Sequence, residues 1–255
     1  MGDKKDRKKL ESKIEKLGRK LEQSLRKHAE LSGVPVGVPI NGVLADERNW
    51  VSPEAEPSWG PGPVLASSRM DVLHAMGMRR SIKRFTDRAV ARADIDQLLE
   101  VAALAPNHRM TQPWRFYVLG PRARRAYGEA LGARKARKLD DADAAAQVAA
   151  KVAAENEALP AAIAVAMKVS EDPERLREDF AATFMGVQNL CLAAVAVGLG
   201  THIKTGAIMD DPAARAAVGV SEDERIVAMI NLGEPDEVPA PKLRTPAAEL
   251  TVWRD

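Results

Sequence analysis

The sequence contains a single cysteine, Cys191, among 255 residues. One thiol cannot form an internal disulfide, and it cannot supply a zinc motif built from several cysteines. It lies in the apolar run NLCLAAVAV, where we expect a buried, unreactive thiol and not a nucleophile. The sequence therefore indicates neither a disulfide-stabilised fold nor cysteine chemistry.

Long hydrophobic runs are also missing. The longest, such as AAIAVAM and LAAVAVGLG, fall far short of the roughly 18 residues that a membrane span needs. The basic N-terminus is not followed by the apolar stretch of a signal peptide, and Asp6 stands where a myristoylation signal has serine or threonine. We expect no transmembrane segment and a cytoplasmic location.

Several sequence motifs that carry chemistry are absent as well. No G-x-G-x-x-G, P-loop, G-x-S-x-G, H-E-x-x-H or EF-hand pattern occurs, and the four histidines lack the short spacing of metal ligands. We therefore expect no metal site and no self-contained nucleophile. Redox or transfer chemistry would have to come from a bound cofactor.

Charge is unevenly distributed along the chain. The formal net charge of +2 argues against a general nucleic-acid binder, but residues 1–31 alone carry eleven Lys/Arg and six Asp/Glu. Apolar residues spaced close to a heptad mark one face of a predicted helix there: Leu10, Ile14, Leu17, Leu21, Leu25 and Leu31. Docking on its own body or pairing with a second copy is the favoured interpretation. An anionic surface or an acidic partner protein is the alternative.

Residues 32–68 contain six prolines and five glycines, which exclude long helices and central strands. We predict an extended linker there, partly laid against a globular domain of residues 69–255. In that domain the pattern predicts helices near 69–78, 92–104, 121–136, 140–158, 174–198 and 210–218, and strands near 114–120, 161–169 and 225–233. Many helices and few strands, without regular βαβ units, indicate an α+β fold.

The stretch RRSIKRF, residues 79–85, places four cations around Ser81. A solvated helix end is one interpretation, and a phosphate-binding segment is the other, because the guanidinium group matches phosphate oxygens with two parallel hydrogen bonds. In an extended backbone Ser81 and Lys83 would point the same way. Arg84 would alternate to the opposite face, where we expect it to be solvated.

Four motifs in series resemble the FMN-dependent nitroreductase family, in particular its small single-domain branch. They are RRSIKRF, LLEVAALAPNHRMTQPWRFYVLG, GVQNLCLAAVAVGLGTHIKTGA, and IVAMINLGEP followed by PKLR. The resemblance covers about residues 69–255 and leaves residues 1–68 unmatched. It implies a three-layer α/β/α fold with a mostly antiparallel central sheet, assembled as an intertwined homodimer. The helix near 174–198, with its alanines and glycines, would form the dimer seam.

The resemblance also implies residue roles at an FMN site. The phosphate and ribityl chain would be held by Arg79, Arg80, Ser81, Lys242 and Arg244, and Lys83 would lie near the pyrimidine edge. His108 and Gln112 would come from the partner subunit. A turn at 200–206 would pass along the flavin, with contacts from Ile203, Lys204, Thr205 and Gly206, although Lys204 could instead point to solvent.

The implied activity is hydride transfer from NADH or NADPH, through FMN, to an electron-poor acceptor such as a nitroaromatic, a quinone or an enone. No side chain would be an obligatory acid or base, so no catalytic residue is named. Two alternatives stay open. One is a different flavin chemistry on the same fold (dehydrogenase, dehalogenase or flavin destructase), and the other is a non-catalytic flavin-binding scaffold recruited through the N-terminal helix.

Overall fold

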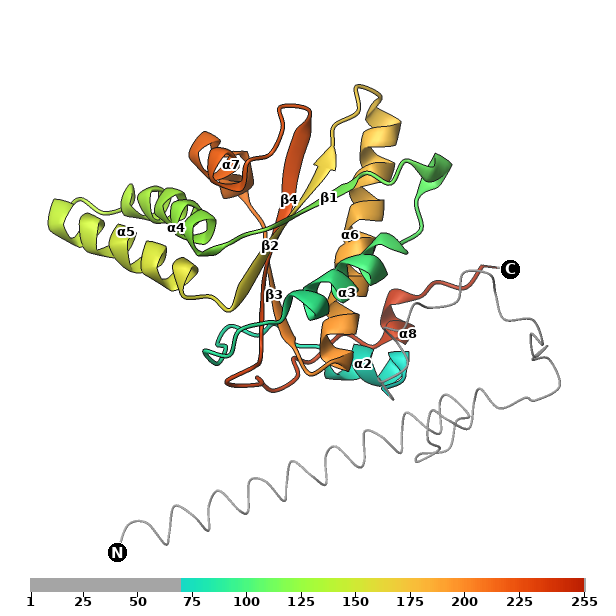
Figure 1. Ribbon diagram of the computed structural model, residues 1–255. Helices are drawn as coiled ribbons and strands as arrows, with labels where there is room; N and C mark the ends of the chain where they lie inside the picture. The colour runs from blue at the N-terminus through green and yellow to red at the C-terminus, as the bar shows by residue number, and fades with distance from the viewer. Residues whose placement is uncertain (1–69, 255) are drawn as a thin grey trace, which may run out of the picture. The chain divides into compact units, whose positions relative to one another are not determined.

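A computed structural model describes residues 70–254 of the chain. The predictions for the basic helix at 1–31 and the linker at 32–68 therefore lie outside the described residues. Within the described part the fold is α+β, as predicted (Figure 1).

A four-stranded antiparallel sheet forms the centre, in the order β1-β2-β4-β3. Its strands are β1 Trp114–Val118, β2 Ala161–Lys168, β3 Gly200–Lys204 and β4 Glu224–Gly233. Three were predicted; β3 was expected to be a turn, and that expectation is wrong. All five residues of β3 pair with β4, from Gly200 opposite Gly233 to Lys204 opposite Met229.

Helices cover both faces of the sheet, which makes three layers (Figure 1). One face packs against α3 Arg92–Ala103 and α6 Pro173–Ala196, and the other against α4 Pro121–Ala136 and α7 Pro212–Val218. A fifth helix, α5 Ala142–Glu157, packs on α4. Strand β2 shows why both faces are covered: Ile163 and Val165 enter the first core, whereas Ala162 and Ala164 enter the second. Alternate residues of one strand thus supply two cores.

Helix α6 lies in the first core with a regular buried stripe: Ala182, Thr183, Gly186, Val187, Leu190, Cys191 and Ala194. This 3-4 spacing is that of an amphipathic helix packed along one face. By length and composition α6 could also cross a membrane, but 50% of its apolar window is buried inside the protein. Cys191 is fully buried, as predicted, and burial raises the pKa of its thiol.

Shorter helical elements connect these layers. They are α2 Val72–Met78, the 3-10 turns η2 His108–Met110 and η3 Ala207–Asp210, and α8 Ala247–Leu250 in the C-terminal tail. Asp71 caps α2 by accepting a hydrogen bond from the backbone N–H of His74 at 2.9 Å. Helix α2 ends at Arg79, where the chain becomes extended, and the predicted phosphate-binding segment begins there.

Candidate functional site

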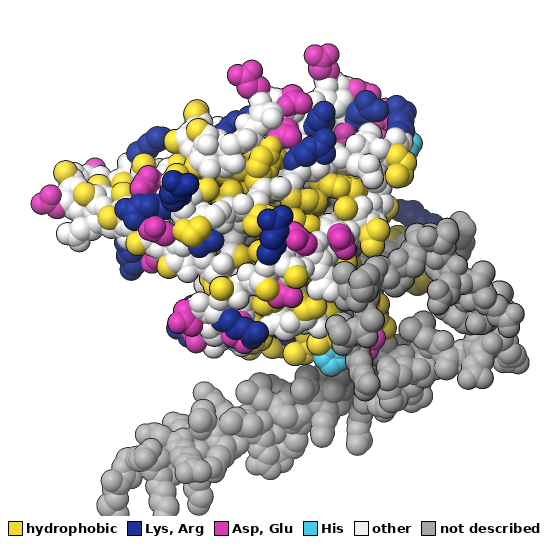
Figure 2. All heavy atoms as spheres, viewed as in Figure 1, with side chains coloured by type: hydrophobic (Ala, Val, Ile, Leu, Met, Phe, Trp, Pro, Cys, Tyr) yellow, Lys and Arg dark blue, Asp and Glu magenta, His cyan; other side chains and the backbone are white. Residues whose placement is uncertain are grey.

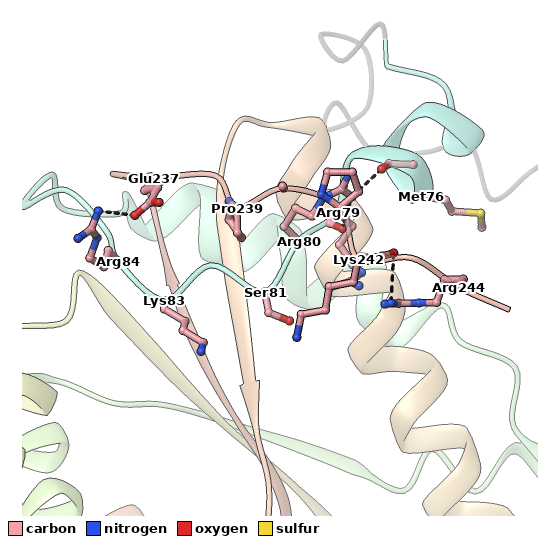
Figure 3. Close-up of a pocket in the computed structure, with 13 residues that line it drawn as sticks. Met76, Arg79, Arg80, Ser81, Lys83, Arg84, Glu237, Pro239, Lys242 and Arg244 are labelled. Carbon is pink, nitrogen blue, oxygen red and sulfur yellow. Dashed lines mark hydrogen bonds and ion pairs between the residues drawn. The ribbon is translucent and has the colours of Figure 1, made fainter. Parts of the chain in front are cut away.

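The segment 79–85 runs beside the sheet and continues it by two isolated bridges. Ser81 forms a parallel bridge with Thr201 of β3, and Phe85 forms an antiparallel bridge with Pro235. The N–H of Ile82 donates to the carbonyl of Thr201 at 2.9 Å. Ile82 is buried while its neighbours Ser81 and Lys83 are exposed. The predicted alternation is therefore present, and Figure 3 shows Ser81 and Lys83 pointing to the same side.

Gly200 allows this close approach. A Cβ at residue 200 would lie 2.5 Å from Cγ1 of Ile82 and 3.0 Å from Cγ of Pro235. Neither distance is compatible with normal packing. Glycine at the first residue of β3 thus lets segment 79–85 and the chain after β4 close over the sheet.

A cavity of about 650 Å³ opens beside this segment (Figure 3). Its walls come from both ends of the domain: the end of α2 with segment 79–84, and the tail at 237–244. The residues that line it are Met76, Gly77, Arg79, Arg80, Ser81, Lys83, Arg84, Glu237, Pro239, Ala240, Pro241, Lys242 and Arg244. The structure thus brings together six of the twelve predicted cofactor-binding residues, Arg79, Arg80, Ser81, Lys83, Lys242 and Arg244.

Two arginines of the segment have structural partners as well. The Nη1 atom of Arg80 donates to the carbonyls of Gly77 and Arg79 at 2.7 and 2.9 Å, so its guanidinium satisfies the C-terminal end of α2. Arg84 forms ion pairs with Asp236 and Glu237. The expectation that Arg84 is merely solvated is wrong, because these pairs tie the C-terminal tail to the segment.

Residues 203–206, which were predicted to contact the flavin, lie at the end of β3 and in the turn after it. Ile203 packs against the core beneath α3 and α6, whereas Lys204, one residue further, lines a second cavity of about 570 Å³ on the opposite side. Burial lowers the pKa of Lys204, and the nearby Lys135 lowers it further. Lys204 therefore does not simply point to solvent. Thr205 and Gly206 are exposed, and Gly206 has φ of 113°, which a side chain would strain.

His108 and Gln112 lie far from the first cavity. They belong to the loop between α3 and β1, which contacts the N-terminal part of α6: His108 Nδ1 lies 2.9 Å from Oε2 of Glu178, and Thr111 donates to Asp179 at 2.6 Å. The cavity instead lies by α2, which packs against α6 near the C-terminal end of that helix (Figure 1). At 1.5 Å per residue, the helix from Asp179 to its end is about 25 Å long. One chain therefore does not bring these two residues to the basic cavity.

The loop that carries them is conformationally strained. Arg109, Met110 and Gln112 have positive φ values of 55°, 51° and 42°. Such values are uncommon outside glycine and persist where surrounding contacts impose them. Asn107 provides one such contact, because its Oδ1 accepts from the N–H of Gln112 at 3.0 Å. The loop is thus held in a defined shape while His108 and Gln112 stay exposed.

Sequence reasoning missed the polar lining of the second cavity, which includes Lys135, Glu155, Asn156, His202 and Asn231. Burial lowers the pKa of His202, and the charges of Lys204 and Lys83 lower it further. Two signals could have found part of this set. Period-two alternation places His202 and Lys204 on one face once residues 200–204 are assigned as a strand. Asn231 is the one amide in the apolar strand sequence RIVAMINLG.

The fold and site define a class of protein: an α+β domain whose sheet edge is flanked by a basic cavity built from both ends of the chain. Comparison with known proteins identifies the family. The model of the nitroreductase family matches residues 76–234. This chain belongs to the nitroreductase family, as its motifs predicted.

The matches to individual relatives cover a similar share of the chain. YfhC of Bacillus subtilis (strain 168), which carries the provisional name of an NAD(P)H nitroreductase, is 35% identical over 170 residues, covering 66% of this chain and 86% of the relative. A nitroreductase-like protein from Bacillus cereus is 28% identical with a TM-score of 0.64, covering 73% of this chain and 97% of that one. A Desulfovibrio desulfuricans structure, provisionally described as a nitroreductase in complex with FMN, is 27% identical with a TM-score of 0.55, covering 72% and 96%.

Proposed function

We propose that this protein is an FMN-dependent oxidoreductase that uses NADH or NADPH to reduce an electron-poor acceptor such as a nitroaromatic, a quinone or an enone. Family membership supports the reaction class. The single observation that carries the proposal for this chain is the cavity in which Arg79, Ser81 and Lys83 meet Lys242 and Arg244. Glu237, the one acidic residue among those that line the cavity, forms an ion pair with Arg84. The other charged side chains of the wall are all basic.

This cavity fits the terminal phosphate of FMN. A phosphate dianion needs several charged or hydroxyl donors around its oxygens, and the cavity offers Arg79, Ser81, Lys242 and Arg244. Figure 3 shows the ammonium end of Lys242 directed toward the side of the cavity where Ser81 lies. Arg80, which is bonded to the end of α2, would support the segment and extend its positive charge.

When bound, FMN would supply the chemistry, accepting a hydride from the nicotinamide and passing it to the acceptor. The residues of this chain would bind and orient the ring. Lys83, which lines both cavities, would lie between the phosphate and the ring. A backbone N–H near Thr205 and Gly206 would donate to the ring, because the open backbone at Gly206 allows close approach. No side chain is required as an acid or base.

We propose a homodimer in which each site uses two chains. His108 and Gln112 are separated from the basic cavity by most of α6, so a partner chain packed in the opposite direction would complete the site. Figure 2 shows hydrophobic side chains gathered across the middle of this face, over β1 and α6. Phe180 and Met185 of α6 are 46% and 42% exposed. Gly186, in contrast, faces Ala102 of α3 within the chain, so the dimer seam would use the face with Phe180 and not the glycine face.

The remaining assignments are also proposals. Residues 69–255 would form the enzyme domain in the cytoplasm, without nucleic acid, metal or a transmembrane segment. Residues 32–68 would link it to the basic helix at 1–31, which would pair with itself or bind a partner protein or an anionic surface.

Absorbance of the purified protein tests the proposal. We expect a yellow protein with the flavin spectrum, one FMN per chain, which bleaches without oxygen on addition of NADH or NADPH. A nitroaromatic or quinone should restore the colour. The proposal would be contradicted if the protein stays colourless after incubation with FMN and shows no FMN binding in a titration.

A further inference from the structure

The C-terminal end of α4 carries a dense group of cations, Arg134, Lys135, Arg137 and Lys138. Within residues 70–254, none of these four side chains forms an ion pair, whereas Arg125, earlier in the same helix, pairs with both Glu129 and Glu157. The end of α4 thus presents positive charge that the described part of the chain does not neutralise.

Two of these cations share the side of α4 that faces the second cavity. Leu131 and Lys135, one turn apart, both line this cavity. The helical turn continues past Lys135, because the N–H of Lys138 donates to the carbonyl of Lys135 at 3.2 Å. In a turn closed by such a bond, the two side chains lie over each other, so Lys138 follows Lys135 on the cavity side. Arg137 lies about 200° around the helix axis from Lys135, on another side.

The second cavity itself has a surplus of cations at this end. Lys204 of β3 faces the same cavity, and its pKa is lowered by burial and further by the charge of Lys135. Glu155 opposes this effect, but it also lies 4.0 Å from the ammonium group of Lys151. Asp141, in the turn after α4, caps the next helix, α5. An anionic group on a ligand would neutralise this surplus charge.

Cations in the last turn of a helix also stabilise it by facing its negative end. That role would apply to Arg137 as much as to its neighbours, and it would not depend on which ligand is bound. A comparison of Arg137 with Lys135 and Lys138 therefore separates a structural role from ligand recognition.

The proposed function requires a nicotinamide dinucleotide to reach a flavin whose phosphate lies in the first cavity. The second cavity adjoins the first, because Lys83 lines both, and it continues along α4 as far as Lys135. NADPH differs from NADH only by a phosphate on the adenosine ribose, which is at the opposite end of the molecule from the nicotinamide. We propose that Lys135 and Lys138 bind this ribose phosphate and that the enzyme therefore prefers NADPH. The inference rests on the proposed function and adds two specificity residues at the end of α4.

Bleaching of the bound flavin without oxygen measures the preference directly and needs no electron acceptor. Flavin-loaded full-length protein is mixed with NADPH or NADH, and the rate constant of bleaching is measured against the concentration of each. We expect NADPH to react about tenfold more efficiently at low concentration, because two exposed ammonium groups would hold its additional phosphate.

The variant that combines Lys135→Gln with Lys138→Gln keeps the length of the polar side chains and removes both charges. It should lower the ratio of the NADPH rate constant to the NADH rate constant by about tenfold. Arg137→Gln is the matched control, because it removes a cation from the same turn on another side of the helix. This control should keep the wild-type ratio.

Calorimetry provides a readout that does not depend on hydride transfer. Adenosine 2′,5′-bisphosphate carries the ribose phosphate of NADPH, and adenosine 5′-phosphate lacks it. Flavin-loaded wild-type protein should bind the bisphosphate more tightly. The variant with Lys135→Gln and Lys138→Gln should lose this difference, and Arg137→Gln should retain it.

Three results would overturn the inference and leave the proposed function intact. They are equal bleaching by NADPH and NADH in wild-type protein, an unchanged ratio in the variant that lacks both lysines, and an equal change of the ratio in Arg137→Gln. The last result would mean that the cations act through the helix and not on the phosphate. If neither nucleotide bleached the flavin, the proposed function would be overturned together with the inference.

Discussion

Ser81 pairs with Thr201 in a parallel β-bridge, and the adjoining N–H of Ile82 donates to the carbonyl of Thr201 at 2.9 Å. The bridge joins segment 79–85 to the edge strand β3, which is distant from that segment in the sequence. It sets the position of Ser81 and Lys83 relative to Lys204 and thereby connects the two cavities. Changes that displace the bridge should affect stability and flavin binding together.

Gly200→Ala tests this coupling. The new methyl group would meet Cγ1 and Cβ of Ile82 at 2.5 and 2.9 Å. Overpacking of this kind typically costs about 1–3 kcal/mol. We expect a lower free energy of unfolding in urea denaturation and weaker FMN binding in titration.

Gly77→Ala is the control for stability. A Cβ at Gly77 would have no neighbour within 4 Å, and the residue lies inside α2. Alanine in a helix is favoured over glycine by up to about 1 kcal/mol. A loss of stability in Gly77→Ala as large as that in Gly200→Ala would show that close packing against Ile82 is not the cause.

The two tyrosines of the chain predict a loss of stability in alkali. Burial raises the pKa of Tyr127 to about 12. A hydrogen bond to Glu224, followed by burial, raises the pKa of Tyr117. Because the folded state holds both protons more tightly, this stabilisation is complete below about pH 10, the ordinary tyrosine pKa. It is lost as the pH rises through the folded-state pKa.

Tyrosinate absorbance and denaturation at increasing pH measure this effect. The native protein should show little tyrosinate near pH 10, and its free energy of unfolding should fall as the pH rises from 10 to about 12. Tyr127→Phe should remove part of that fall, and Tyr117→Phe isolates the Tyr127 titration. Ordinary titration of both tyrosines in the native protein would refute the prediction.

The helices could be predicted because their periodicity is local. The spacing of Leu190, Cys191 and Ala194 marks the buried face of α6 in the sequence itself. Strand β3 could not be assigned in the same way, because it is short, begins with glycine and carries His202 and Lys204 beside apolar Ile203. Its conformation is imposed by pairing with β4, a contact between distant segments.

The same distinction between local pattern and distant contact applies to the candidate site. Arginine, serine and lysine in RRSIKRF indicate phosphate chemistry from the sequence alone, and in the structure both basic segments line the first cavity. The second cavity depends on the packing of α4 and α5 beside β4, so no local pattern brings Lys135 near Asn231. The role of Arg84 was missed for the same reason, since its partners Asp236 and Glu237 lie at the other end of the domain.

Mixing two defective variants tests whether each site uses two chains. One variant combines Ser81→Ala with Arg244→Ala, and the other combines His108→Ala with Gln112→Ala. In a mixed dimer one site receives the intact cavity of one chain and the intact loop of the other. Random mixing should therefore restore roughly a quarter of the wild-type sites.

The measurement is NADH or NADPH oxidation after the two variants are unfolded together and refolded. Each variant refolded alone is the control and should be weakly active. Activity of the mixture that equals the mean of the two separate samples would contradict a shared site. It would place His108 and Gln112 outside the flavin environment.

The phosphate assignment for Lys242 and Arg244 is tested by comparing FMN with riboflavin, which lacks the phosphate. Wild-type protein should bind FMN far more tightly, because charged donors in the first cavity would hold the phosphate. Lys242→Ala with Arg244→Ala should weaken FMN binding by roughly 100-fold or more, because two charged hydrogen bonds of about 1.5–3 kcal/mol each are lost, and leave riboflavin binding nearly unchanged. Arg122→Ala, on the exposed side of α4, is the matched control and should alter neither affinity. Equal losses for both flavins would mean that the tail shapes the cavity without contacting the phosphate.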